Sequence, residues 1–309
     1  MPVPTTDETR AQFLGDRRKG IGGSDAAAIV LGSDGYRTAS DVWLDKTGLL
    51  KASVAGTKAT DRGNWLEAPI LDRYVARMAS WTGSFARPAR VFDALDPLAA
   101  PGTPTWMRAS PDLLGLSLAG DVAFGCDAKS CFGVATREYG EEGTDAVPEY
   151  VLLQCMHYIA FFGVLYWDVE AFCGDNLRGE FRSYRIHRDD ELVAVLLDAE
   201  RVFWTQHVLP GVPPQPNDVA SATRLVKALY PGSLAPMRSI ARSSAAARDL
   251  ERLRDAEEAF CAAGEDLESA RNRAKELIGD AVGCDVDGVG KVTWMSRRDG
   301  ARTFRTKWI

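Results

Sequence analysis

Apolar residues recur at helical spacing in several parts of the first half of the chain. Between 63 and 78, an apolar residue stands at every fourth position from 66 onward, which predicts an amphipathic helix. Shorter helices are predicted at 23–30 and 41–47, and a longer one follows Val147. The stretch 85–130 instead has short apolar runs bounded by turn residues, a pattern typical of strands. Helices on both sides of a strand-rich middle predict an α/β sandwich.

Four prolines between 209 and 218 interrupt any regular element, so the main domain is expected to end there. The predicted organisation is a core of residues 1–216 and an extension of residues 217–309. Within the extension, apolar residues step by three and four along 249–278, which predicts an amphipathic helix or a helical hairpin. Packing on the core and contact with another copy in an oligomer are two open interpretations of this segment. Its apolar residues are Leu250, Leu253, Ala256, Phe260, Ala263, Leu267, Ala270, Ala274 and Leu277.

The end of the chain, 291–309, predicts a β-hairpin that turns at Arg298, Asp299 and Gly300. It is rich in Arg and Lys, and aromatic residues are interleaved with these cations. A solvated basic hairpin and a contact to the DNA backbone are both compatible with this composition. The aromatic residues are Trp294, Phe304 and Trp308.

The composition is that of an ordinary globular protein. The chain has 309 residues, of which 46% are hydrophobic and 26% are charged, enough for a large core. No apolar run reaches the roughly 18 residues of a membrane span and no signal segment opens the chain, so a cytoplasmic protein without membrane contact is expected. The net charge of −6 argues against a surface covered with basic patches but leaves room for a basic channel.

The six cysteines are interpreted as small buried hydrophobic residues, because none forms a C-x-x-C pair and cytoplasmic thiols stay reduced. The first two have a spacing unlike that of a zinc site, and the three histidines are scattered along the chain. The cysteines are Cys126, Cys131, Cys155, Cys173, Cys261 and Cys284.

Carboxylates occur in an order that a metal-dependent phosphodiesterase would need. Glu67 lies early in the helix predicted at 63–78, Asp112 follows Ser-Pro, and Asp127 precedes Lys129 by two residues on a predicted strand. Singly, each has an ordinary explanation as a solvated side chain, a turn residue or a surface ion pair. Together they supply hard oxygen ligands for Mg²⁺ and a cation beside the attacking water, which phosphodiester hydrolysis requires.

Strand geometry explains the spacing of Asp127 and Lys129. Residues two apart on a strand point to the same side, so Asp127 is predicted to bind the metal and Lys129 to orient or deprotonate the nucleophilic water. Ala128 points to the other side, where a small side chain suits packing beneath a helix. Its backbone carbonyl is predicted to add a metal ligand.

The helix predicted after Val147 is apolar nearly all round and is therefore expected to be buried. Its polar exceptions, Tyr150, Gln154, His157 and Tyr158, fall on one face. A buried glutamine satisfied by local backbone is the ordinary explanation. Beside a carboxylate cluster, these groups are predicted to orient ligands or phosphate oxygens.

Near the N-terminus, Arg17, Arg18 and Lys19 precede a Gly-Gly-Ser24 helix start. A simple capped helix is the ordinary interpretation, and no Walker or dinucleotide-binding pattern is present. The basic residues favour a phosphate contact at the helix N-terminus.

The chain resembles the YqaJ-like viral recombinases, relatives of bacteriophage lambda exonuclease within the PD-(D/E)XK nucleases. The resemblance covers about 17–216 and implies a restriction-endonuclease-like core, with a mixed central sheet flanked by helices. It further implies a 5′→3′ exonuclease on double-stranded DNA ends that depends on Mg²⁺, with Mn²⁺ as a substitute ion. The matching blocks are RRKGIGGSDAAAI, GNWLEAPILDRY, RASPDLLG, CDAKS, VPEYVLLQCMHYIAFFG and YRIHRDDELVAVLLDAERVFWTQHVLPGVPP.

The resemblance also implies partners and origin. Such an exonuclease forms a homo-oligomer, in some cases a ring, and works with a single-strand annealing protein in phage-type recombination. It is phage or prophage encoded and acts in the cytoplasm of a bacterial host. Two alternatives stay open, namely a DNA-end-binding recombination factor with weak or no cleavage activity, and an endonuclease of the same fold.

Roles follow from the resemblance residue by residue. Asp112 and Asp127 match the family's metal carboxylates, Lys129 its catalytic lysine, and Glu67 and Gln154 the acid and the glutamine on the flanking helices. Relatives more often carry Glu at the second carboxylate. An aspartate still reaches a metal, but it moves the site by roughly one C–C bond, about 1.5 Å.

A second group of residues is expected to contact phosphate and DNA. Arg17 and Ser24 match the arginine and serine that hold the terminal 5′-phosphate, and Arg18 is an alternative to Arg17. Tyr158, on the polar face of the buried helix, belongs to the same predicted set.

Overall fold

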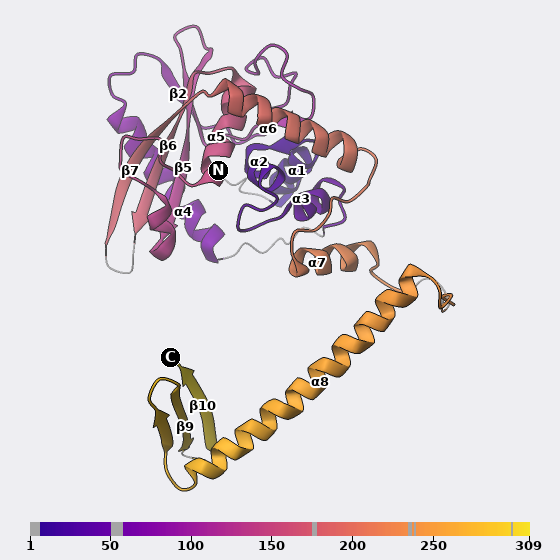
Figure 1. The fold of residues 1–309 in the computed structure, drawn as a ribbon. Helices are drawn as coiled ribbons and strands as arrows, with labels where there is room; N and C mark the ends of the chain where they lie inside the picture. Colours follow the sequence, from indigo (N-terminus) through magenta and orange to yellow (C-terminus); the bar gives the residue numbers. More distant parts are fainter. Residues whose placement is uncertain (1–6, 51–57, 175–177, 234–236, 238, 298) are drawn as a thin grey trace. The chain divides into compact units, whose positions relative to one another are not determined.

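The computed structural model consists of two compact units, Met1–Gly232 and Ser233–Ile309 (Figure 1). No helix among the described residues has the length and apolarity needed to cross a bilayer. The structure describes residues 7–50, 58–174, 178–233, 237, 239–297 and 299–309.

The described part of the first unit contains seven strands. They are β1 (Ile21–Gly22), β2 (Ser84–Ala86), β3 (Met107–Arg108), β4 (Leu113–Leu116), β5 (Val122–Phe132), β6 (Tyr166–Gly174) and β7 (Gly179–His187). Five of them form one sheet in the order β2-β4-β5-β6-β7, and β1 pairs with β3 separately. Within the large sheet only β5 and β6 are parallel. The predicted α/β core with a mixed central sheet is therefore confirmed.

Helix α4 (Lys58–Arg77) covers one face of this sheet and α5 (Glu149–Phe162) covers the other, with α2 (Gly23–Val30) and α6 (Asp190–Phe203) packed on α5 (Figure 1). The other helices of the first unit are α1 (Asp7–Arg18), α3 (Ala39–Lys46) and α7 (Val219–Leu229). Helix α4 packs Leu71 and Tyr74 against Phe124 of β5. Helix α5 packs Val151 and Ile159 into the core cluster of the other face. A 3₁₀ turn, Gly133–Glu138, and a π-helical turn, Trp204–Val208, complete the unit.

The central strand β5 extends beyond its neighbour β4. Strand β4 pairs with β5 only as far as Cys126, whereas β5 continues alongside β6 to Phe132. Among the described strands, residues 127–132 therefore have a partner on one side only. The other side is a backbone edge inside the molecule, and the predicted catalytic residues lie at its start.

The predicted helices are found, with some shifted ends. The helix predicted at 23–30 coincides with α2, whereas the helix predicted from 41 begins at Ala39, as α3. The earlier start of α3 has a local cause, since the backbone N–H of Asp41 donates to the Thr38 hydroxyl and the N–H of Thr38 donates to the Asp41 carboxylate. This reciprocal capping box fixes the first turn.

The first unit ends later than the proline-rich segment indicates. Helix α7, which follows that segment, belongs to the first unit because Leu225 packs with Val42 and Trp43. Arg224 also donates from Nε and Nη2 to the Asp41 carboxylate, at 2.7 and 2.6 Å. The boundary in the structure therefore follows Gly232 rather than residue 216.

The second unit contains one long helix, α8 (Ala245–Ile278), rather than a helical hairpin. It is followed by an antiparallel sheet of β8 (Gly283–Val286), β9 (Gly290–Ser296) and β10 (Arg302–Trp308). The hairpin predicted near the C-terminus is confirmed as β9 and β10, although Arg298 of its predicted turn lies outside the described residues. The first strand, β8, was not predicted.

The cysteines divide into two groups. Cys126, Cys131, Cys155 and Cys173 are buried in the first unit, as predicted. The prediction was wrong for two others, Cys261 on α8 and Cys284 on β8, which are exposed. These two lie on elements that bury little surface within the second unit, so a small apolar residue there has no core to enter.

Candidate active site

A cavity of about 330 Å³, here called the active-site cavity, opens beside the free edge of β5. Its wall is built from α4, α5, β5, the segment before β4, and the N-terminal region. Asp127 and Arg18 are predicted site residues that do not line it. The predicted residues that line it are Arg17, Ser24, Glu67, Asp112, Ala128, Lys129, Gln154 and Tyr158.

Asp127 is only 1% exposed and supports the cavity wall from the core. Its Oδ2 accepts hydrogen bonds from Lys129 Nζ at 3.0 Å and from Gln154 Nε2 at 2.7 Å. Its Oδ1 accepts one from Trp167 Nε1 at 3.3 Å. Because Lys129 Nζ also donates to Gln154 Oε1, at 2.9 Å, the three polar side chains close a triangle. This triangle holds the ammonium group of Lys129 in one position at the cavity wall.

The protonation states of this cluster follow from its charges. Burial by itself lowers the pKa of Lys129, but the charges of Asp127 and Asp112 raise it above its usual range. Lys129 is therefore an ammonium ion, suited to stabilise negative charge. Burial raises the pKa of Asp127, the charge of Lys129 lowers it, and the charge of Asp112 raises it, so that the pKa of Asp127 lies above its ordinary value. The negative charge of Asp112 thus disfavours ionisation of Asp127.

The Asp112 carboxylate binds the backbone edge of β5 that has no strand partner. Its Oδ2 accepts a hydrogen bond from the backbone N–H of Ala128 at 2.9 Å. The N–H and C=O of one strand residue point to the same side, so the Ala128 carbonyl also faces away from β6. The Ala128 side chain packs against the cluster that contains Leu71 and Tyr74 of α4, as predicted. Missing strand pairing at this edge thus makes backbone groups available to the cavity.

The donor set is compatible with a divalent cation that prefers oxygen. Among the described residues, no three His, Cys, Asp or Glu side chains already converge as a metal cluster. The oxygen donors at this site are the carboxylates of Asp112 and Glu67, the Ala128 carbonyl and, behind them, the carboxylate of Asp127. A cation near two mutually repelling carboxylates relieves their repulsion, and Mg²⁺ usually keeps several water ligands beside one or two carboxylates.

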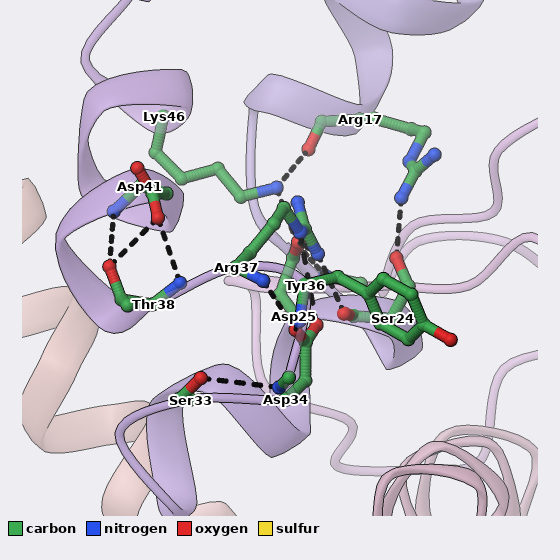
Figure 2. A network of polar contacts seen from close by, with 12 residues as sticks. Arg17, Ser24, Asp25, Ser33, Asp34, Tyr36, Arg37, Thr38, Asp41 and Lys46 are labelled. Carbon is green, nitrogen blue, oxygen red and sulfur yellow. Dashed lines mark hydrogen bonds and ion pairs between the residues drawn. The ribbon is translucent and has the colours of Figure 1, made fainter. Parts of the chain in front are cut away.

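A buried polar network supports the N-terminal side of the cavity (Figure 2). Its centre is Asp25, which is fully buried and accepts hydrogen bonds from Gly22 N–H at 2.9 Å and Arg37 Nη2 at 2.9 Å. Lys46 Nζ lies 2.6 Å from the same carboxylate. Burial by itself raises the pKa of Asp25, but the charges of Lys46, Arg37 and Arg17 hold it far below its usual range. Asp25 is therefore an anion that ties α2 and α3 together.

The same network positions Arg17 and Ser24. Lys46 Nζ donates to the Arg17 carbonyl at 3.0 Å, and Arg37 Nη2 donates to the Ser24 carbonyl at 2.7 Å. The Arg17 guanidinium donates to Ser24 Oγ at 2.5 Å (Figure 2). The sequence analysis did not find Arg37 or Lys46, because their partners lie many residues away and no local pattern marks such pairs.

A second cavity of about 340 Å³ shares Arg17, Ser24 and Gln154 with the active-site cavity and adds Arg37 and Tyr150. The two cavities are therefore adjacent and share part of their walls. The predicted alternative to Arg17 lies elsewhere. Arg18 donates from Nε to the Asp45 carboxylate at 3.0 Å and lines neither of these two cavities.

The polar face predicted on α5 is split by the structure. Gln154 and Tyr158 line the active-site cavity, whereas His157 is buried away from it. His157 Nδ1 lies 2.7 Å from Glu200 Oε1 and Nε2 lies 2.9 Å from the Arg108 carbonyl oxygen. This contact ties α5 and α6 to the segment that leads to Asp112. Glu200 was not predicted, because its partner is 43 residues away.

Comparisons with known proteins agree with the sequence blocks. Residues 12–164 match the YqaJ-like viral recombinase domain. This part of the chain belongs to the YqaJ-like viral recombinase family. The chain is 29% identical over 227 residues to the uncharacterized protein YqaJ of Bacillus subtilis (strain 168), a match that covers 73% of this chain and 65% of that protein.

Solved structures with a similar course of the chain include two exonucleases. An alkaline exonuclease from Laribacter hongkongensis has a TM-score of 0.48 and 15% identity, covering 71% of this chain and 100% of that one. A phage-related exonuclease from Haemophilus somnus 129PT has a TM-score of 0.40 and 11% identity, covering 62% of this chain and 96% of that one.

Proposed function

We propose that this YqaJ-like protein is a Mg²⁺-dependent 5′→3′ exonuclease acting on double-stranded DNA ends. The observation that carries the proposal is that Glu67, Asp112, Lys129 and Gln154 line the same cavity as Arg17 and Ser24. Carboxylates and an ammonium group suit phosphodiester hydrolysis, and an arginine–serine pair suits a terminal phosphate.

In this proposal, each residue of the site has a separate role in phosphodiester hydrolysis. Lys129, held by Asp127 and Gln154, faces the phosphate and stabilises the negative charge that develops on its oxygens. Asp112 and Glu67, with the Ala128 carbonyl, hold the metal, and Asp127 orients Lys129 besides contributing charge. When bound, Mg²⁺ supplies a nucleophile by lowering the pKa of a bound water and neutralises charge on the phosphate.

The proposed 5′→3′ polarity follows from the place of Arg17 and Ser24 in the active-site cavity. A terminal 5′-phosphate bound by Arg17 and Ser24 leaves the next phosphodiester beside Lys129, because one cavity wall carries all three residues. The buried network around Asp25 keeps Arg17 and Ser24 from relaxing when the phosphate departs. Manganese would replace magnesium at such an oxygen-donor site.

The proposal extends to partners and setting. Membership of a viral recombinase family supports a role in phage-type recombination, with a single-strand annealing protein that receives the exposed 3′ strand. It also supports a homo-oligomer, for which a ring is one form, in a phage or prophage acting in the cytoplasm of a bacterial host.

The test is a digest of linear and covalently closed duplex DNA by the purified protein with Mg²⁺. An exonuclease shortens 5′-phosphorylated linear DNA and releases mononucleotides, while closed circles survive. Cutting of closed circles would indicate an endonuclease instead. Binding of ends without any release, in both Mg²⁺ and Mn²⁺, would overturn the enzymatic proposal. The matched control is Lys129→Ala, which should bind ends and release nothing.

A further inference from the structure

Two thiols meet at the ends of the adjacent strands β5 and β6 (Figure 1). Cys131 of β5 is directly in register with Cys173 of β6 in this parallel pair. Their Sγ atoms lie 2.7 Å apart, and the Cys131 thiol donates a hydrogen bond to the Cys173 sulfur. Both residues belong to the first unit, and their contact joins positions that are 42 residues apart in the chain.

The other two buried cysteines of this unit are placed differently. Cys126 and Cys155 are fully buried in the core. Cys126 Sγ donates only a long hydrogen bond, of 3.9 Å, to the neighbouring Asp127 carbonyl. In the part of the chain that the structure describes, neither of these thiols makes a hydrogen bond to another cysteine. The contact between Cys131 and Cys173 is therefore not a general consequence of burying cysteines in this core.

The two thiols of this pair differ in acidity. The hydrogen bond from Cys131 lowers the pKa of the Cys173 thiol, burial raises it and the charge of Arg182 lowers it, so that it lies below its ordinary value. The hydrogen bond to Cys173 and burial raise the pKa of Cys131. Cys173 also lines a cavity of about 590 Å³ together with Arg182. Cys173 is thus the sulfur that a small oxidant reaches as a thiolate, with a second thiol beside it.

We propose that Cys131 and Cys173 form a redox-modification site, at which hydrogen peroxide produces a reversible disulfide. The Cys173 thiolate attacks one peroxide oxygen, the O–O bond breaks, hydroxide leaves, and the sulfur is oxidised to a sulfenic acid. The Cys131 sulfur then attacks the Cys173 sulfur, the S–O bond breaks, and the departing oxygen leaves as water with the proton of Cys131. Two thiols and one peroxide thus give one disulfide and two waters.

The structure needs little rearrangement to form this bond. The Sγ atoms are 2.7 Å apart, against about 2.05 Å in a disulfide. Among the described strands, residues 127–132 of β5 pair with β6 alone. The backbone of this segment can therefore follow Cys131 toward β6 without breaking another strand pair.

The same movement reaches the active-site cavity. Cys131 lies two residues after Lys129 and points to the same side of β5. The Ala128 N–H donates to Asp112 at 2.9 Å on the side away from β6, so a shift of this segment toward β6 lengthens that hydrogen bond. It also displaces Lys129 Nζ from its contacts of 3.0 and 2.9 Å. Small displacements of reacting groups have large effects on rate, so oxidation should slow cleavage roughly tenfold.

Mass spectrometry of the full-length protein tests the modification. A Cys261→Ser, Cys284→Ser background removes the exposed thiols. After treatment with stoichiometric hydrogen peroxide, denaturation and alkylation, a peptide pair linked through Cys131 and Cys173 should appear, and dithiothreitol should remove it. The other two buried cysteines should be alkylated. No such link, whether both thiols stay free or Cys173 proceeds to a sulfinic acid, overturns the proposal, and so does a link to either of the other two.

Cleavage of 5′-phosphorylated linear DNA measures the effect on the active site, which rests on the proposed nuclease function. The peroxide-treated background protein should cleave roughly tenfold more slowly than the reduced protein, and dithiothreitol should restore the rate. The matched control adds Cys131→Ser, and its rate should not respond to peroxide. Equal rates with and without the disulfide would overturn the link to the active site. An inactive reduced protein would overturn the proposed nuclease function and leave the mass-spectrometric result standing.

Discussion

Two neighbouring strands of the first unit carry buried charge on opposite faces of the sheet. On β5, Asp127 and Lys129 point toward Gln154 of α5, and Lys129 lines the active-site cavity. On β6, Asp168 and Glu170 face α4, since Asp127 is in register with Val169 between them. All three carboxylates are almost fully buried. Their surroundings, however, differ in what supplies the hydrogen bonds.

The β6 carboxylates are enclosed by protein donors. Asp168 accepts from the Tyr74 hydroxyl at 2.6 Å and from Arg185 Nε and Nη2 at 2.7 and 2.8 Å. Glu170 accepts hydrogen bonds from Arg73, Arg77 and Ser183. Such a cluster is complete without any ligand, and its role is to join α4, β6 and β7.

The β5 cluster, unlike the β6 cluster, borders a cavity. Lys129 and Gln154 contact Asp127 and also line a cavity large enough for a phosphate and water. Buried charge by itself therefore does not distinguish a structural cluster from a candidate reaction site. The informative feature is buried charge next to a cavity and an unpaired strand edge, which leaves room for a substrate.

The largest expected effect is on the β5 cluster. Asp127→Asn and Lys129→Ala should each lower Mg²⁺-dependent cleavage by about 10²–10³-fold or more, because each removes a charge that acts on the reacting phosphate. Duplex binding should persist. Single-turnover digestion and a binding assay measure the two properties. Full activity of either variant contradicts the assignment.

Two matched variants sharpen this result. Glu170→Gln, on the enclosed β6 cluster, should retain cleavage per folded molecule. Glu67→Gln should lose less activity than Asp127→Asn, since its carboxylate serves the metal from the helix side alone. An inactive, fully folded Glu170→Gln variant would show that the two faces are not functionally distinct.

The next effect concerns stability. Arg185→Met should lower the free energy of unfolding by about 2 kcal/mol, because it removes two charge-assisted hydrogen bonds from the buried Asp168 carboxylate, and the 43% exposure of the Arg185 side chain reduces the loss below that of a fully buried pair. Arg188→Met is the control, since Arg188 pairs with Asp190, whose side chain is 80% exposed, and should cost less than about 1 kcal/mol. Urea unfolding measures both. Equal losses would mean that the enclosed cluster adds no stability.

A smaller effect is expected at the phosphate end of the cavity. Arg17→Ala should lower the preference for 5′-phosphate over 5′-hydroxyl ends by roughly tenfold or more, because a charge-assisted hydrogen bond is lost. Arg18→Ala is the control, since Arg18 is paired with Asp45 outside the cavity. The ratio of the cleavage rates on 5′-phosphate and 5′-hydroxyl duplexes measures this preference. A changed ratio in Arg18→Ala with none in Arg17→Ala would reverse the assignment.

The smallest effect is a pH dependence from His157. Burial by itself lowers the pKa of His157, but the charge and hydrogen bond of Glu200 and the bond to the Arg108 carbonyl raise it above 6.5. The stabilisation from this histidine is fully present below pH 6.5 and is lost as the pH rises through the folded pKa. A His157→Gln, Glu200→Gln double variant should lack this slope in urea unfolding between about pH 6 and pH 9. If unfolding free energy depends on pH in the same way in the wild type and the double variant, the dependence comes from titratable groups other than His157.

Features that depend on neighbours along the chain could be predicted from the residue pattern alone. Periodicity predicted α4 and, as a helix or a helical hairpin, α8, because residues three and four apart share a helix face. The two-residue spacing of Asp127 and Lys129 predicted their common direction on β5, and their 3.0 Å contact bears this out. Turn residues predicted the C-terminal hairpin. Each of these is a short-range property that needs no knowledge of the topology.

Contacts between residues far apart in the chain could not be predicted locally, because the fold sets them. It brought Asp112 to the Ala128 amide, directed Arg17 to Ser24 and Arg18 to Asp45, and paired His157 with Glu200. It also moved the unit boundary to Gly232, because α7 finds its packing partners in α3. The physical reason is that a buried polar group needs a partner with correct geometry, but any residue that the chain topology brings near can supply it.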